Sequence, residues 1–176
     1  MSEQKEKWAG WLALSTAIMA VLAALTTLYM GKFSSRAIMS QGQESDQWAY
    51  YQAKSIKGHA FEINKKTLEL QFLTQKGLSP EVAAEYQKTL NKYSEEIKRY
   101  DAEKKEIKDK AEAIAKAKLK AQDMGGNFAY ALIFLQIALM LASISSLTKR
   151  KYLWYIALIC NLGWIFFFLD AWILFY

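Results

Sequence analysis

The sequence of 176 residues contains one proline, one cysteine and one histidine. A single cysteine excludes an internal disulfide framework and a thiolate metal cluster, and the lone histidine, His59, has no second His or Cys to complete a metal site. The sequence also lacks a Ser-His-Asp set, a phosphate-binding glycine loop and an HExxH motif. We therefore predict no cofactor, no metal site and no catalytic residue, and we expect that the protein is not an enzyme.

Charge is abundant in the middle of the chain and scarce at both ends. Lys and Arg total 23, Asp and Glu total 17, and the formal net charge is +6. Most of these residues lie between Lys32 and Asp123. Basic helices with charges of mixed sign are usually solvated faces, and no nucleic-acid-binding motif accompanies them. We expect no nucleic-acid partner.

Three long apolar segments predict three transmembrane helices. Residues 8–30 and 128–147 carry no charge, and residues 152–176 carry one. About 20 helical residues cross the roughly 30 Å hydrocarbon core of a bilayer. The first segment is longer than the apolar region of a cleaved signal peptide, which has about 7 to 15 residues, so we predict an uncleaved anchor.

Small residues follow one face of the first span at alternating spacings of three and four. In a membrane, small residues let helix backbones approach closely, which favours association between helices. Alanine is also common in membrane helices generally, but the regular spacing favours a tight interface. We predict that the stripe forms a homo-oligomer interface, comprising Gly10, Ala13, Ala17, Ala20 and Ala24.

Residues 32–124 predict a long antiparallel coiled-coil hairpin between the first and second spans. A turn is expected at 77–80, because Gly77 suits a left-handed C-cap, Ser79 an N-cap and Pro80 the first helical position. The helices on either side of this turn each have about 45 residues. The glycine pair at 125–126 is expected to interrupt the returning helix and to act as a hinge before the second span.

Both halves of the predicted hairpin show a heptad seam, the pattern of coiled coils. The returning seam is Ala83, Tyr86, Leu90, Tyr93, Ile97, Tyr100, Lys104, Ile107, Ala111, Ile114, Lys118 and Ala121. The outgoing seam is expected at Ile38, Gly42, Ser45, Ala49, Gln52, Ile56, His59, Ile63, Lys66, Leu70 and Leu73. Folding about the turn then pairs Leu70 with Tyr86 and Ile56 with Tyr100. Polar seam positions suggest that several subunits pack together, and we assign the ladder Tyr86, Tyr93 and Tyr100 to the oligomer interface.

Three polar residues lie inside the predicted spans: Gln136, Asn161 and Asp170. An ionisable side chain in a span is a candidate functional site because its burial in lipid is costly. Asp170 is about six residues from the C-terminus of the sequence, so an interfacial or interhelical role is the alternative. Asn161 is nine positions away, on the opposite face of the helix from Asp170.

The most distinctive local sequence is Trp-Ala-Tyr-Tyr-Gln-Ala-Lys-Ser-Ile-Lys, from Trp48 to Lys57. On a helix it places aromatic and basic side chains on one surface, with Tyr50 and Lys54 four residues apart and Tyr51 on the neighbouring face. This surface is predicted either to contact a partner or an anionic headgroup, or to pack between subunits.

This phrase, with one N-terminal span, a charged helical segment and two C-terminal spans, resembles a family of bacterial membrane proteins, the domain-of-unknown-function family numbered four-three-three-seven. The resemblance covers nearly the whole chain. It implies architecture only: an all-α membrane protein with three transmembrane helices.

The function we expect is that of a membrane scaffold or adaptor that forms a homo-oligomer and displays a helical stalk. The expected partners are other copies of itself and membrane lipid. A channel or transport component using Asp170, Asn161 and Gln136 is one alternative, and an accessory subunit bound to another membrane protein is a second.

The expected location is the bacterial inner membrane, with several passes. The short basic loop Lys149 to Lys151 favours a cytoplasmic loop and a periplasmic hairpin. Basic residues near the span ends on the hairpin side, among them Lys32 and Arg36, favour the opposite orientation, with the hairpin in the cytoplasm.

Overall fold

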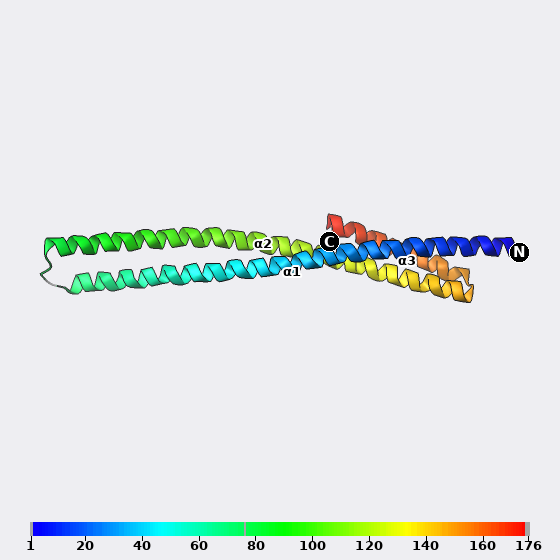
Figure 1. The fold of residues 1–176 in the computed structure, drawn as a ribbon, viewed down its shortest axis with the longest axis horizontal. Coiled ribbons are helices and arrows are strands. Elements are labelled where there is room, and N and C mark those ends of the chain that lie inside the picture. Colours follow the sequence, from blue (N-terminus) through cyan, green and yellow to red (C-terminus); the bar gives the residue numbers. More distant parts are fainter. Residues whose placement is uncertain (1, 76, 175–176) are drawn as a thin grey trace. The chain divides into compact units, whose positions relative to one another are not determined.

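The computed structural model describes residues 2–75 and 77–174, with side chains from Lys7 onward. All of the described secondary structure is α-helical: α1 Ser2–Thr74, α2 Pro80–Thr148 and α3 Lys151–Ile173 (Figure 1). Each of the three helices is long and apolar enough to cross a membrane. The all-α fold with three candidate spans is thus confirmed. Lys76 and the last two residues of the third predicted span lie outside the described residues.

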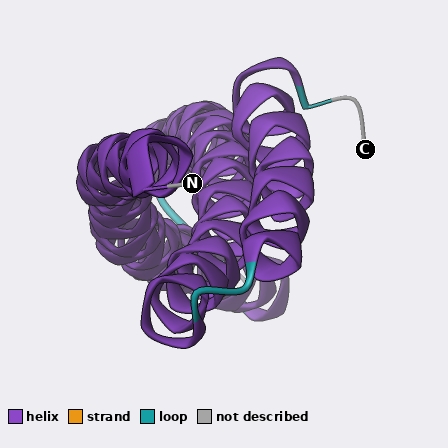
Figure 2. Ribbon diagram, turned by 90° about the vertical axis from the view of Figure 1, so that its right-hand side faces the viewer, coloured by secondary structure: helices purple, strands orange, loops and turns teal. Residues whose placement is uncertain are grey.

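Short connections join the helices, as Figure 2 shows in teal. Between α1 and α2, Gly77 has φ +80, a left-handed conformation that favours glycine. The Ser79 side-chain oxygen accepts the Val82 N–H at 3.4 Å, and Pro80 is the first residue of α2. Between α2 and α3, Ser145 Oγ donates to the Arg150 carbonyl at 2.9 Å.

The predicted hinge at the glycine pair is wrong, because α2 is helical without a break from Pro80 to Thr148. A Cβ at Gly125 would lie 3.4 Å from Ser34 Oγ and 3.7 Å from Phe33 Cβ. Gly125 therefore lies against α1, and an added Cβ would make ordinary van der Waals contact there. Helix–helix packing offsets the roughly 1 kcal/mol that glycine costs in a helix interior relative to alanine.

The chain divides into two compact units. The first, which we call the three-helix unit, comprises the residues up to Met39 and those from Ala117 onward. The second comprises Ser40–Lys116; its part of α1, residues 40–74, is the first arm and its part of α2, residues 80–116, is the second arm. Each unit has its own interior.

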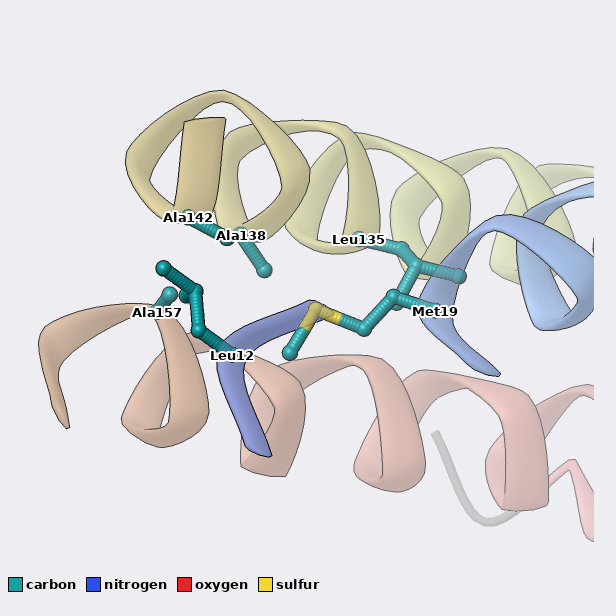
Figure 3. Close-up of a cluster of buried hydrophobic side chains, with 6 residues drawn as sticks. All are labelled: Leu12, Met19, Leu135, Ala138, Ala142 and Ala157. Carbon is teal, nitrogen blue, oxygen red and sulfur yellow. The ribbon is translucent and has the colours of Figure 1, made fainter. Parts of the chain in front are cut away.

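Small and aromatic side chains fill the three-helix unit. One buried cluster, drawn in Figure 3, comprises Leu12, Met19, Leu135, Ala138, Ala142 and Ala157. A second contains Phe33, Met124, Phe128 and Ala171. α2 and α3 approach closely at Gly163, where an added Cβ would lie 2.6 Å from the Phe134 ring. These contacts bring one surface of each helix against its neighbours.

Ring contacts join the two arms. Phe61 lies with its ring centroid 5.7 Å from the centroids of both Tyr93 and Tyr100, and Phe72 lies 5.6 Å from Tyr86. The Tyr86 hydroxyl donates to Gln75 Oε1 at 3.0 Å. The predicted seam positions of the second arm are all buried or half-buried.

The expected seam of the first arm is wrong by two residues. Ile56, Ile63, Leu70 and Leu73 are 70%, 64%, 63% and 77% exposed. The residues that face the second arm are Tyr51, Lys54, Gly58, Phe61, Leu68 and Phe72, which are buried or half-buried. Gly58 lies against Tyr100 of the second arm, whose Cβ is 3.4 Å from where a Gly58 Cβ would be.

Candidate functional site

The small-residue stripe of the first span is exposed in a single chain. Gly10, Ala13, Ala17, Ala20 and Ala24 are all exposed, and a Cβ at Gly10 would meet nothing within 4 Å. Three of them, Ala13, Ala17 and Ala20, line an open groove of about 1020 Å³. The stripe therefore presents a shallow, apolar surface outside the interior of the unit.

The groove has an apolar floor and a basic edge. Its other lining residues are Trp8, Ala9, Leu12, Thr16, Ala142, Ser143, Ser146, Leu147, Lys149 and Lys151. The Lys151 ammonium lies 5.9 Å from the centroid of the Trp8 ring. A neighbouring face of α1 is buried through Leu12, which also borders the groove, Met19 and Thr26. The same helix thus has one face used within the chain and one face of small residues left open.

The three tyrosines assigned to the oligomer interface lie against the first arm of their own chain. Tyr100 is 8% exposed, and Tyr86 and Tyr93 are half-buried. Their rings contact Phe61 and Phe72. These residues hold the two arms together, and their part in contacts between chains stays a prediction.

Part of the basic and aromatic surface at 48–57 of the first arm lies against the second arm, and part of it is exposed to solvent. Lys54 Nζ lies 2.6 Å from Glu103 Oε2 and 5.3 Å from the Tyr50 ring centroid. The hydrogen bond to Glu103 raises the pKa of Lys54, and the same bond lowers the pKa of Glu103. Trp48 packs edge-on against Tyr51 at 5.7 Å.

Two members of that surface remain open to a partner or a headgroup. Tyr50 is half exposed and Lys57 is exposed. Lys54 and Tyr51 are used within this chain: the Lys54 ammonium joins the first arm to the second, and Tyr51 is half-buried on the face toward the second arm. Contact of the surface with a partner or lipid stays a prediction.

The three polar residues of the predicted spans do not share one contact. Gln136 is exposed, and the Asn161 side chain donates to the Ala157 carbonyl of its own helix at 3.1 Å. Asp170 is 4% exposed, and its Oδ2 accepts a hydrogen bond from Asn127 Nδ2 at 2.7 Å. This bond joins α3 to α2 and supplies a partner for a buried carboxyl.

Sequence reasoning missed the side chains that hydrogen-bond to each other across the three-helix unit. Trp154 Nε1 donates to Ser15 Oγ, and Trp164 Nε1 donates to Thr26 Oγ1, each at 3.0 Å. Both bonds fasten α3 to α1. The available signal was four Ser and Thr hydroxyls in the first apolar segment and three tryptophans in the third, but their pairing depends on helix rotation, which periodicity does not supply. Asn127 was missed for the same reason.

In the described part of the chain, no three His, Cys, Asp or Glu side chains come together as a metal site would need. His59 Nδ1 lies 3.0 Å from Glu62 Oε2, one turn away on an exposed face. The arrangement offers exposed helix surfaces and interhelical hydrogen bonds.

These features define a class: an all-α protein whose three helices are each long and apolar enough to cross a membrane. The chain belongs to the family described as Domain of unknown function (DUF4337), whose sequence profile matches residues 8–174. The resemblance drawn from the Trp48 to Lys57 phrase and the order of the spans is thereby confirmed. No curated protein and no solved structure matches the chain.

Proposed function

We propose that the protein is a multi-pass membrane scaffold that assembles as a homo-oligomer through the small-residue stripe of its first span. The observation that carries this proposal is the exposure of Ala13, Ala17 and Ala20 on the apolar part of α1. Lipid tails do not drive apolar helices together, so close backbone approach over small residues is the route by which membrane helices associate.

The scaffold displays residues 40–116 as an antiparallel coiled-coil hairpin outside the membrane. The ring contacts between the arms and the Lys54–Glu103 ion pair support this arrangement. So do the ion pairs on the exposed surface of the second arm, such as Lys110 with Glu106 at 2.6 Å, because such pairs suit water and not lipid.

The location we propose is the bacterial inner membrane, with the hairpin in the periplasm. The short connection at Lys149 to Lys151 then faces the cytoplasm, as the excess of basic residues in short cytoplasmic loops favours. Cysteine labelling of Lys105→Cys from either side of sealed vesicles, in a chain with Cys160 replaced by Ser, tests the side directly.

Oligomer formation is tested by native mass spectrometry of the full chain in detergent. We expect a wild-type oligomer and a shift toward monomer in Ala17→Leu and Ala20→Leu, because the added side chains hold the backbones apart. Ile18→Phe and Leu25→Phe are matched controls, since they enlarge exposed side chains of the same helix outside the stripe. A wild-type chain that stays monomeric, or stripe variants that assemble like the wild type, would overturn the proposal.

A further inference from the structure

The first arm carries two heptad faces, and the second arm covers only one of them. The other face repeats at alternating spacings of four and three and comprises Ala49, Ala53, Ile56, Ala60, Ile63, Thr67, Leu70 and Thr74, all of them exposed. We call this set the outer face. It extends over about four heptads.

A lone pair of helices needs apolar residues on the covered face only, but in the first arm both faces carry them: Phe61, Leu68 and Phe72 lie on the covered face, and Ile56, Ile63 and Leu70 on the outer face. The covered face includes the charged residues Glu44, Lys54 and Lys65, each half-buried. The outer face has no charged residue and leaves Ile56, Ile63 and Leu70 each more than 60% exposed. Aliphatic side chains in a regular row on the solvated side of a helix mark an interaction surface.

The spacing of the outer face indicates what covers it. An average period of 3.5 residues keeps a row of side chains against a second helix that supercoils with the first, whereas a row meeting a flat surface has no need of this period. The small residues Ala53 and Ala60 alternate with Ile56 and Ile63, so a facing helix can approach closely between the larger side chains.

A second molecule of this chain offers a matching surface in its own outer face. The second arm does not, because apart from Val82 its exposed side chains are small, polar or charged. Several of these side chains already pair along the helix, including Lys88 with Glu85 at 3.6 Å and Lys108 with Glu112 at 3.8 Å. An apolar face therefore has its complement in the same face of another copy, which is the arrangement of an isologous interface.

We propose that the outer faces of two copies pair in parallel and in register. This inference deepens the homo-oligomer proposed above and depends on it for the direction: copies inserted the same way in one membrane have parallel α1 helices. Ile56, Ile63 and Leu70 then each meet their own counterpart, and Ala60 and Thr67 form the layers between them.

The flanking charges are compatible with this alignment. In a parallel, in-register pair, each residue flanking one side of the seam faces the flanking residue five positions further along the other chain. Gln52 of one copy then faces Lys57 of the other, His59 faces Asn64, and Lys66 faces Gln71. Each basic group meets a neutral amide and no like charges oppose each other. Asp46, at the next seam position before Ala49, would bring two carboxylates together and so marks the N-terminal limit of the pairing.

Disulfide cross-linking of single-cysteine full-length chains in native membranes tests the alignment. In a background with Cys160→Ser, the variants are Ile56→Cys, Ile63→Cys and Leu70→Cys, and the matched controls are Glu85→Cys and Lys105→Cys on the exposed surface of the second arm. We expect all three outer-face variants to give several-fold more cross-linked dimer on oxidation than the controls. An antiparallel pairing would cross-link efficiently at no more than one of the three, and that outcome would overturn the proposal.

A second measurement separates this inference from the proposed function. Ile56→Glu with Ile63→Glu should abolish the cross-link at Leu70→Cys, while circular dichroism shows the helix content of the wild type. If the outer-face cysteines fail to cross-link while the wild type remains an oligomer that Ala17→Leu dissociates, the outer-face pairing is wrong and the proposed function stands. If the wild type is monomeric, both fail.

Discussion

The three-helix unit and the pair of arms are held together by side chains of different sizes. Fully buried positions of the three-helix unit are mainly alanines, namely Ala131, Ala138, Ala142, Ala157 and Ala171, each 0% exposed. The buried apolar positions of the arms are the larger Leu90, Tyr100 and Ile107 together with Ala111, which is 0% exposed. Small side chains therefore take a larger part in the interior of the three-helix unit than in that of the arms.

The difference follows from what surrounds each helix. Helices that are apolar all round gain little from burying large side chains against each other if lipid is the alternative, so close packing and hydrogen bonds decide which surfaces meet. Helices with charged outer surfaces gain from removing large apolar side chains from water. The two units should therefore be destabilised by opposite substitutions. Truncation of a buried side chain should destabilise the arms most, and enlargement of a buried side chain should destabilise the three-helix unit most.

The largest effect is expected from truncation in the arms. Tyr100→Ala removes a buried ring that contacts Phe61 and Lys54, and loss of a large core side chain costs about 3 to 5 kcal/mol. Thermal unfolding followed by circular dichroism should show an early loss of part of the helix signal. Val82→Ala, at a 43% exposed site of the same arm, is the control and should change little. If Tyr100→Ala and Val82→Ala lowered the unfolding temperature equally, Tyr100 would not be the buried seam residue that its contacts indicate.

Enlargement in the three-helix unit comes next. Gly163→Ala places a methyl group 2.6 Å from a Phe134 ring atom, and overpacking of this kind costs about 1 to 3 kcal/mol. Gly126→Ala is the matched control, because its Cβ would meet nothing within 4 Å and the helix gains up to about 1 kcal/mol. The two substitutions should shift the unfolding temperature in detergent in opposite directions. A shift of the same sign would contradict the close approach at Gly163.

A smaller effect is expected at the buried carboxyl. Asp170→Ala leaves the Asn127 amide without its acceptor and should cost about 1 to 3 kcal/mol of stability in detergent. Asp170→Asn retains a side-chain oxygen that can accept from Asn127, so its loss should be smaller. Ion flux into liposomes, measured on the same variants, tests the alternative channel function. A flux present in the wild type and absent from a normally folded Asp170→Asn would favour that alternative.

The smallest effect concerns pH and the half-buried ion pair between the arms, Lys54 with Glu103. Lys54 lowers the pKa of Glu103, so the stabilising contribution of Glu103 is present above its unfolded pKa, about 4, and is lost as the pH falls through the lower folded value. Glu103 raises the pKa of Lys54, so the contribution of Lys54 is present below about pH 10 and is lost as the pH rises through the higher folded value.

This ion pair is tested by unfolding the full chain across the acid range. Lys54→Met should make the loss of stability below about pH 4 shallower than in the wild type, since Glu103 then has no cation at 2.6 Å. Lys110→Met serves as the control, because its pairing with Glu106 lies within one arm and does not join the two. Identical acid profiles for wild type and Lys54→Met would show that the pair contributes nothing measurable.

The sequence was sufficient for the helices and the family, but not for the rotation of the helices. Apolar length and the scarcity of proline predict the three helices, and the phrase at 48–57 predicts the family. Two faces of the first arm both satisfy the heptad pattern, so periodicity alone could not identify the one that meets the second arm. Contacts between residues distant in sequence, such as Gly58 with Tyr100 and Phe61 with Tyr93, distinguish the two faces.

The candidate site residues likewise divide into those that the sequence pattern could identify and those that depend on how the helices are rotated. The exposure of the stripe at Ala13 to Ala24 is compatible with its prediction as an interface, since a face needed by another molecule is one that the chain itself leaves uncovered. The hydrogen bonds of Trp154 and Trp164 to α1 could not be predicted, because they depend on which turns of two distant helices meet.

The order of contacts along the arms has a kinetic consequence. Gln75 meets Tyr86 across the turn, Phe61 meets Tyr93 further along, and Lys54 meets Glu103 further still. Each contact shortens the loop that remains to be closed by the next, so the entropy of closure is spread over many small steps. The arms should therefore fold as a zipper that starts at Gly77: substitutions beside the turn slow folding, while those at Lys54 and Glu103 chiefly accelerate unfolding.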